Sequence, residues 1–159
     1  MRAESDAGDA HVTVIGNSYG STTTGIAASE FGLAADDVVL SGSPGAGTAG
    51  HVSEFTTGAG HTWVASASSD AVTYIGRSSS ENVREIVTGS SLGFDPADEV
   101  FGAQRVEAES VDRSTTWPWQ VPVEHGRYLD AGSGDQAAGA SVGRAVSGTS
   151  SRRLPGRGG

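Results

Sequence analysis

The sequence predicts an α/β fold built on a parallel β-sheet, and three observations support this prediction. Compact apolar, β-branched runs of strand length recur along the chain. Helix-length segments separate several of them, which is typical of βαβ units. Glycine or acidic residues bound these runs. With 159 residues, of which 36% are hydrophobic, the chain suits one small domain with a modest core.

The first predicted unit is a strand, a sharp turn and a helix. The run HVTVIG, residues 11–16, has the composition of a strand, and the small and apolar residues after it favour a helix that ends at Gly32. Two further buried strands are predicted, DVVLSG at 37–42 and HTWVASAS at 61–68. The glycine-rich segment 43–60 between them is expected to be a loop with at most a short helix.

The second half of the chain has weaker signals. ENVREIVTG at 81–89 has helical spacing, AQRVEAE at 103–109 resembles a strand, and QAAGASVGRAVSG at 136–148 resembles a final helix. The last residues have the composition of a disordered tail. The predicted organisation is a flexible leader, one domain and a tail, at residues 1–10, 11–148 and 149–159.

Composition excludes several classes of function. The formal net charge of −9 repels phosphate backbones, so we expect no nucleic-acid partner. Cysteine is absent, which excludes thiolate nucleophiles, disulfides and cysteine-based zinc sites. No apolar run approaches the roughly 20 residues of a membrane span, and the first ten residues lack the apolar core of a signal peptide. We therefore expect a cytoplasmic protein without a membrane partner.

A nucleophile motif lies at the junction between the first strand and the helix. Gly16-Asn17-Ser18-Tyr19-Gly20 matches G-x-S-x-G in the strand–turn–helix context that this motif requires. In such a turn the serine backbone is strained, and side chains at the two glycine positions are expected to collide with neighbouring backbone. We predict Ser18 as the nucleophile and the N–H of Tyr19 as an oxyanion donor. The alternative is that Ser18 is simply the N-cap of the helix.

A nucleophilic serine needs a base and an acid, and in this class the chain order is serine, acid, histidine. Asp70 follows the third predicted strand, at the carboxyl end where such sheets keep their chemistry. His125 comes late, in a predicted loop, and so satisfies the order. We therefore predict a Ser18, Asp70 and His125 triad, against the alternatives that Asp70 caps a helix and His125 is a surface residue. The remaining histidines are less well placed in the chain to act as the base of Ser18: His11, His51 and His61.

The chain also resembles an actinobacterial family of α/β-hydrolase-fold proteins of uncharacterised function. The family shows TVIGHSYGSTT, DDVVLVGSPG, a GHVW strand leading to Asp, FG(A)xRF and a late HSGYFD. This chain shows TVIGNSYGSTT, DDVVLSGSPG, GHTWVASASSD, FGAQRVEAE and HGRYLD, so the similarity covers about residues 11–148. The resemblance implies Ser18 as nucleophile, Asp70 as acid and His125 as base. With the motif above, we predict a serine hydrolase of the esterase type that acts on a small-molecule ester, or alternatively on an amide, without a cofactor. The chain departs from the family at Asn17, where histidine is usual, and after His125.

A complete α/β-hydrolase sheet has several strands before the nucleophile strand, and a loop among them supplies a second oxyanion donor. Only ten residues precede HVTVIG here. We therefore expect the chain to correspond to the C-terminal half of such a domain, without its N-terminal strands. One edge of the nucleophile strand is then unpaired, and we expect it to be a site of self-association or partner binding.

Two other functions compete with the hydrolase. GAGTAG at 45–50 matches the dinucleotide motif G-x-G-x-x-G after a strand, although the segment behind it is short and glycine-rich for the required helix. The other is a catalytically inactive structural or interaction domain, in which Trp117 and Trp119 form either a binding platform or a packed loop. No metal-binding spacing is present, and DPADE at 95–99 is interpreted as a helix start.

Overall fold

The structure, a computed structural model, describes residues 10–67, 70, 72–73, 92–106, 108, 125 and 128. Within this part four strands form one sheet in the order β1-β2-β3-β4, and each neighbouring pair is parallel. The strands and the helix are β1 (Thr13–Asn17), α1 (Tyr19–Glu30), β2 (Asp37–Ser41), β3 (Thr62–Ala65) and β4 (Gln104–Val106). The predicted α/β fold with a parallel sheet is confirmed.

Helix α1 connects β1 to β2, and a long segment with short 3₁₀ turns connects β2 to β3. Segment 43–60 is mostly loop, and 3₁₀ turns lie at Val52–Glu54 and Ala59–His61, as the glycine content predicts. A further 3₁₀ turn covers Glu99–Phe101, and the Asp98 carboxylate accepts a hydrogen bond from Val100 N (3.0 Å) at its start. The interpretation of DPADE as a helix start is therefore confirmed. Several expectations lie outside the described residues: the leader, the helices at 81–89 and 136–148, both tryptophans after residue 110, and the tail.

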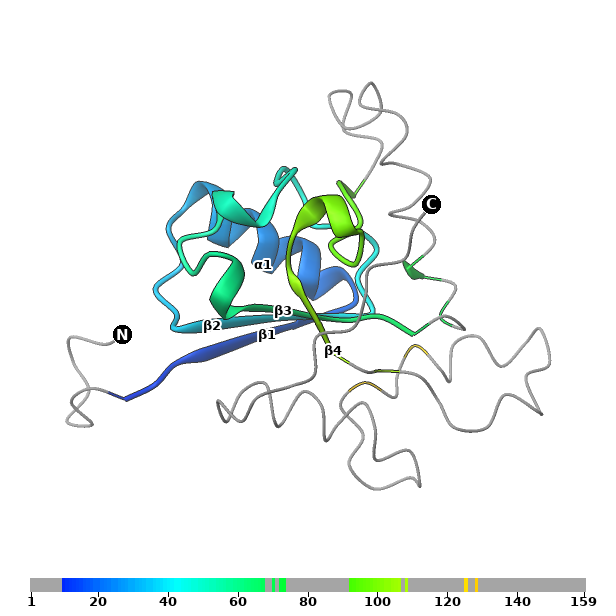
Figure 1. The fold of residues 1–159 in the computed structure, drawn as a ribbon, viewed down its shortest axis with the longest axis horizontal. Coiled ribbons are helices and arrows are strands. Elements are labelled where there is room, and N and C mark those ends of the chain that lie inside the picture. Colours follow the sequence, from blue (N-terminus) through cyan, green and yellow to red (C-terminus); the bar gives the residue numbers. More distant parts are fainter. Residues whose placement is uncertain are drawn as a thin grey trace.

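The alternation of side chains along β2 divides the core into two clusters, one on each face of the sheet. Val38 and Leu40 belong to the first cluster, with Ala28 of α1. Val39 belongs to the second, which also contains Tyr128. Figure 1 shows α1 lying along one face of the sheet with the turns beside it. All five residues of β2 are buried, in agreement with its interior place between β1 and β3.

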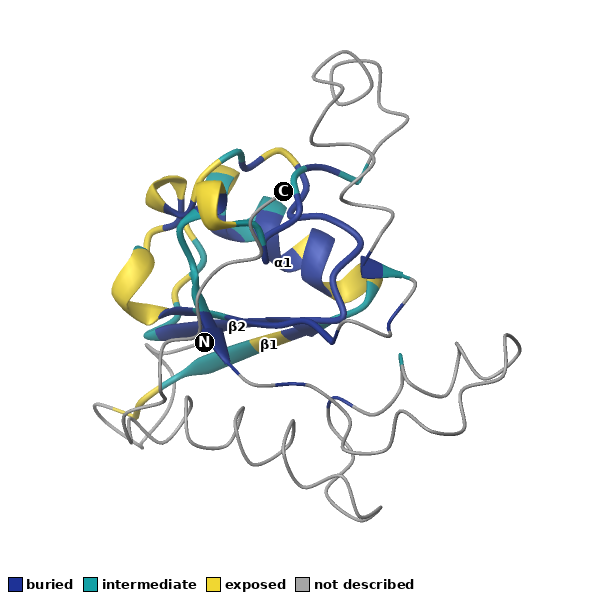
Figure 2. Ribbon diagram, turned by 45° about the vertical axis from the view of Figure 1, so that its right-hand side comes forward, coloured by how far each residue is buried: buried dark blue, intermediate teal, exposed yellow. Residues whose placement is uncertain are grey.

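Strand β1 is less covered than its neighbour. It pairs with β2 on one side and forms an edge of the described sheet. Figure 2 shows this difference, with β2 buried and β1 largely intermediate or exposed. Ile15, in the middle of β1, is 42% exposed. The strand that leads to Ser18 therefore presents an apolar, incompletely paired edge within the described part of the chain.

Two histidines meet one carboxylate at the amino end of the sheet. Asp37 begins β2, and its oxygens lie 2.6 Å from His11 Nε2 and 2.9 Å from His61 Nδ1. Parallel strands start at the same edge, so this contact joins the segment before β1 to the start of β3. The Asp37 side chain is buried, whereas both imidazoles are more than half exposed. The cluster lies at the opposite ends of the strands from Ser18.

Glycines allow main-chain segments to touch around α1. A Cβ on Gly25 would overlap the carbonyl of Ala46, and a Cβ on Gly47 would overlap the side chain of Ile26. Gly47 also forms a parallel β-bridge with Gly93, and the backbone of Gly47 occupies the space that a Cβ on Gly93 would need. Helix α1 and two loops are thus packed backbone against backbone. No helix in the described part of the chain is long and apolar enough to cross a membrane.

Candidate functional site

The turn between β1 and α1 holds Ser18 in a strained conformation. Ser18 has φ 55° and ψ −130°, and it is the one non-glycine residue with positive φ in the described part of the chain. Its N–H donates to Ser41 O on β2 (2.9 Å), which fixes the turn to the sheet. The Ser18 side chain makes no capping hydrogen bond to α1. Ser18 therefore occupies the N-cap position of α1, as the alternative expected, but its side chain does not cap the helix. Backbone strain of this kind clusters at functional sites.

The two flanking glycines do not play equal parts. A Cβ on Gly16 would lie 2.7 Å from Ser21 Cα and 2.8 Å from Gly20 O, so the tight turn requires glycine there. A Cβ on Gly20 would meet no atom of the described residues within 4 Å. The expected collision at Gly20 is therefore wrong for this part of the structure, because Gly20 lies in the first turn of α1 and faces open space.

The structure brings Ser18, His125 and Asp70 together in a line. Ser18 Oγ is 2.6 Å from His125 Nε2, and His125 Nδ1 is 2.8 Å from Asp70 Oδ2. An ionised carboxylate only accepts hydrogen bonds, so Nδ1 carries the imidazole proton and donates it to Asp70. Nε2 is then the acceptor for the Ser18 hydroxyl. The His125 side chain is 18% exposed, which leaves the imidazole partly open to solvent.

Asp70 is fully buried, so hydrogen-bond donors of the protein must replace water around its carboxylate. Its Oδ1 accepts a hydrogen bond from Val72 N (2.9 Å), so Asp70 caps the following turn as the alternative reading expected. Its Oδ2 accepts from His125 and also from the hydroxyl of Tyr128 (2.8 Å). One carboxylate therefore serves the turn and the histidine together, because its two oxygens face in different directions.

The sequence analysis did not single out Tyr128 or Gly42, which both pack against this carboxylate. A Cβ on Gly42 would lie 2.7 Å from Tyr128 Cε2 and 3.1 Å from both Asp70 Oδ2 and His125 Cε1. Gly42 has φ 52° and directly follows β2. The available signals were the tyrosine three residues after His125 in HGRYLD and the glycine at the carboxyl end of a buried strand. Neither signal by itself indicates which side chains the tyrosine or the glycine contacts in the folded protein.

The other histidines are held elsewhere. His11 and His61 contact Asp37, and His51 Nδ1 accepts a hydrogen bond from Ser53 N (3.0 Å) at a 3₁₀ turn. Their exclusion as the partner of Ser18 agrees with this placement. Within the described residues, no group of three or more histidine and acidic side chains is arranged to hold a metal ion.

The GAGTAG segment uses its backbone donors for packing. The N–H of Ala46 donates to Phe94 O (2.8 Å), that of Gly47 to Leu92 O (2.9 Å), and that of Gly50 to the Glu54 carboxylate (2.9 Å). A phosphate cradle needs such N–H groups to point at the ligand, followed by a helix N-terminus. The helix that follows is a 3₁₀ turn of three residues. This arrangement disfavours the dinucleotide-binding interpretation.

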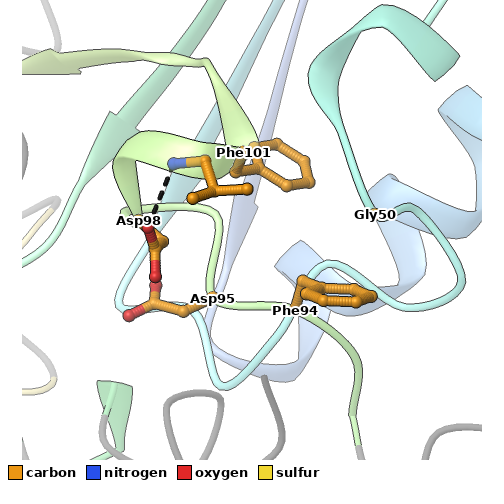
Figure 3. Close-up of a pocket in the computed structure, with 6 residues that line it drawn as sticks. Gly50, Phe94, Asp95, Asp98 and Phe101 are labelled. Atoms are coloured by element: carbon orange, nitrogen blue, oxygen red, sulfur yellow. Dashed lines mark hydrogen bonds between the residues drawn. The ribbon is translucent and has the colours of Figure 1, made fainter. Parts of the chain in front are cut away.

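A separate cavity of about 170 Å³ lies beside the 3₁₀ turn Glu99–Phe101. Figure 3 shows the rings of Phe94 and Phe101 on one side of it and the carboxylates of Asp95 and Asp98 on the other. Both carboxylates accept hydrogen bonds from backbone N–H groups at the starts of turns. None of the cavity's lining residues belongs to the Ser18, His125 and Asp70 cluster. The cavity thus lies between the segment before β4 and Gly50, apart from the Ser18, His125 and Asp70 cluster.

Two curated proteins of Mycobacterium tuberculosis are similar in sequence to this chain. An uncharacterized protein from the Oshkosh strain of Mycobacterium tuberculosis is 34% identical over 132 residues, which cover 77% of this chain and 20% of that protein. A second M. tuberculosis strain has an uncharacterized protein with the same identity and coverage. The chain thus spans about a fifth of the length of these curated relatives. No solved structure matches.

A family model gives the more specific assignment. The model described as alpha/beta hydrolase matches residues 1–80, just over half of the chain. The matched region contains β1, the strained turn, α1, β2 and β3, and it ends beyond Asp70. Parallel strands, a helix packed on the sheet and a serine at a strained strand-to-helix turn are the features expected of that fold. On these grounds the chain belongs to the alpha/beta hydrolase family.

Proposed function

We propose that the protein is a serine hydrolase that cleaves esters of small molecules through a Ser18, His125 and Asp70 triad. The observation that carries the proposal is the continuous pair of contacts from Ser18 Oγ to His125 Nε2 (2.6 Å) and from His125 Nδ1 to Asp70 Oδ2 (2.8 Å). Family membership supports hydrolase chemistry in general. No cofactor takes part, because a triad supplies the nucleophile and the proton transfers itself.

The proposed reaction begins when Ser18 Oγ attacks the ester carbonyl carbon and its proton passes to His125 Nε2. Asp70 stays ionised and stabilises the imidazolium through Nδ1–H. The tetrahedral intermediate then collapses, the ester C–O bond breaks, and the leaving alcohol takes the proton from Nε2. Water attacks the resulting acyl-serine by the same route, with His125 as base, and releases the carboxylic acid and free Ser18.

The negative charge of the tetrahedral intermediate requires hydrogen-bond donors. Tyr19 is the first residue of α1, and the first N–H groups of a helix lack partners within the helix. We assign the N–H of Tyr19 as one oxyanion donor, assisted by the positive end of the α1 dipole. The Tyr19 N–H is therefore part of the proposed catalytic machinery. In other enzymes, removal of one such donor lowers the rate by about 10²–10³-fold.

Covalent labelling tests the proposal directly. A fluorophosphonate is expected to modify the protein once, at Ser18, as read by intact mass and peptide mapping. Ser18→Ala abolishes the label, and Ser29→Ala, which removes a hydroxyl near the other end of α1, leaves it unchanged. His125→Ala slows labelling by about 10²–10⁴-fold because the general base is lost. A folded wild-type protein that stays unlabelled would refute the assignment.

The edge strand favours a second candidate, an interaction domain without catalysis. The supporting observation is that β1 pairs with β2 alone within the described sheet and exposes Ile15. We propose a second copy of the chain as the partner, added strand to strand along β1. Gel filtration with light scattering is expected to show a dimer that Ile15→Lys converts to monomer. If the wild-type protein is a monomer and is labelled at Ser18, the interaction-domain candidate is refuted and the hydrolase is the one supported function.

A further inference from the structure

The hydroxyl of Tyr128 lies between the main chain of the sheet and the carboxylate of Asp70. Its oxygen is 2.9 Å from Ala67 N and 2.8 Å from Asp70 Oδ2. Tyr128 is 2% exposed and Asp70 is fully buried, so bulk water does not compete for either contact. Hydrogen bonds to an ion are stronger in such an environment than at the surface. The tyrosine thus links the backbone just after β3 to the carboxylate.

The chemistry of the partners fixes the direction of both hydrogen bonds. A backbone N–H can only donate, so the phenolic oxygen accepts from Ala67. An ionised carboxylate can only accept, so the phenolic O–H donates to Asp70 Oδ2. The same Oδ2 accepts the Nδ1–H of His125. Two donors from different directions therefore hold one carboxylate oxygen, and a third donor, Val72 N, holds the other.

Packing prevents the phenol ring from leaving this position. The ring belongs to the cluster on the second face of the sheet, with Val39 and Val106. It also meets His125 edge to face, with ring centroids 6.5 Å apart and an interplanar angle of 81°. Gly42 leaves no spare room on the side where its missing side chain would lie. The position of the hydroxyl is therefore set by the sheet and its core.

We propose that Tyr128 is a positioning residue: its hydroxyl anchors Asp70 Oδ2 in the direction in which that oxygen accepts the Nδ1–H of His125. This inference rests on the proposed hydrolase function and deepens it. Tyr128 does not touch the reacting atoms, and it acts through Asp70 on the orientation of the imidazole. Small errors in such orientation cost large factors in rate, because the base must face the serine hydroxyl.

The test compares Tyr128→Phe with Thr62→Val in the whole chain. Both variants delete one buried hydroxyl and keep the shape of the side chain, but Thr62 Oγ1 bonds to Gly58 O near the opposite end of β3. Three quantities are measured: the thermal midpoint, the fluorophosphonate labelling rate and the low-field proton resonance of His125 Nδ1–H. We expect comparable losses of thermal stability in the two variants. We expect Tyr128→Phe alone to slow labelling, by about 10- to 100-fold, and to move the resonance.

Each outcome separates this inference from the proposed function. If wild type labels at Ser18 and Tyr128→Phe labels at the same rate with an unmoved resonance, the positioning role is overturned and the hydrolase stands. If Thr62→Val slows labelling as much as Tyr128→Phe, the effect is general loosening and the inference is also overturned. If folded wild type does not label at all, the proposed function itself fails.

A second measurement keeps the inference testable if Tyr128→Phe does not fold. Growth with 3-fluorotyrosine keeps every ring and hydroxyl but makes the phenol a stronger donor. The chain has three tyrosines, so the fluorinated protein is also prepared with Tyr19→Phe and Tyr74→Phe, which leaves the label at Tyr128 alone. We expect the His125 Nδ1–H resonance to move in the fluorinated protein, because the competing donor on Oδ2 has changed. An unchanged resonance would overturn the inference.

Discussion

Gly42→Ala adds one methyl group behind the proposed catalytic residues. The new Cβ would lie 2.7 Å from Tyr128 Cε2 and 3.1 Å from Asp70 Oδ2 and His125 Cε1. All three neighbours belong to groups that hydrogen bonds and packing hold in place. The backbone of Gly42 also has φ 52°, a conformation that side chains disfavour. The substitution therefore combines backbone strain with steric overlap.

The two contributions can be separated with Gly32→Ala. Gly32 has φ 61°, close to that of Gly42, but a Cβ there would meet nothing within 4 Å among the described residues. Gly32→Ala is expected to cost only the left-handed strain, about 1–2 kcal/mol of unfolding free energy. Gly42→Ala adds the cost of overpacking, about 1–3 kcal/mol, which brings its total to about 2–5 kcal/mol. The difference between the variants measures the overlap alone.

Urea unfolding followed by circular dichroism gives both free energies, and the labelling rate at Ser18 gives a second readout. We expect Gly32→Ala to label like wild type. Gly42→Ala is expected to label about 10²-fold more slowly, because a displacement of the imidazole by a fraction of an ångström spoils its alignment with Ser18. Equal losses of stability in the two variants would refute the reasoning, since the neighbours of Gly42 would then absorb the methyl group without cost.

Four further variants test the fold by urea unfolding. Gly25→Ala is expected to lose about 1–3 kcal/mol because its Cβ overlaps the carbonyl of Ala46, whereas Gly20→Ala in the same helix gains about 0.5–1 kcal/mol; the reverse order would contradict the packing described for α1. Leu40→Ala, at a fully buried position of the central strand, is expected to cost about 2–5 kcal/mol, and a loss under 1 kcal/mol would mean that β2 is not central. Asp37→Asn is expected to cost at most about 1 kcal/mol because its histidine partners are exposed, and a larger loss would show that this cluster organises the sheet.

Local patterns were sufficient to predict the described elements of the fold. HVTVIG, DVVLSG and HTWVASAS overlap β1, β2 and β3, because β-branched runs between glycines and acidic residues have few alternatives. Strand β3 is shorter than predicted and ends at Ala65. The end of α1 also follows from local chemistry, since Gly32 adopts the left-handed conformation that terminates helices. The order of the strands agrees with simple βαβ connectivity, in which consecutive strands lie side by side.

The site was less predictable, because its contacts join residues far apart in the chain. Chain order and strand ends were enough to nominate Ser18, Asp70 and His125, and the structure places both Ser18 and Asp70 within hydrogen-bond distance of His125. Tyr128 was not predicted as part of the site. A tyrosine in a sequence is most simply interpreted as a packed core residue, and the contact of its hydroxyl with Asp70 depends on the three-dimensional fold. The steric role expected for Gly20 was wrong because the motif does not specify which neighbours each glycine has.

The backbone contacts around α1 give a reason for the unusual composition, in which 24 of 159 residues are glycine and only 36% are hydrophobic. Where Gly25 meets Ala46, and Gly47 meets Gly93, the interior is filled by peptide groups rather than by long side chains. Such an interior tolerates enlargement poorly: a Cβ on Gly25 or Gly93 would overlap the backbone of another segment, and a Cβ on Gly47 would overlap the side chain of Ile26. Evolution of this protein is therefore expected to preserve these glycines while many surface polar residues change. Homologues would then share the pattern of glycines more readily than a pattern of large apolar residues.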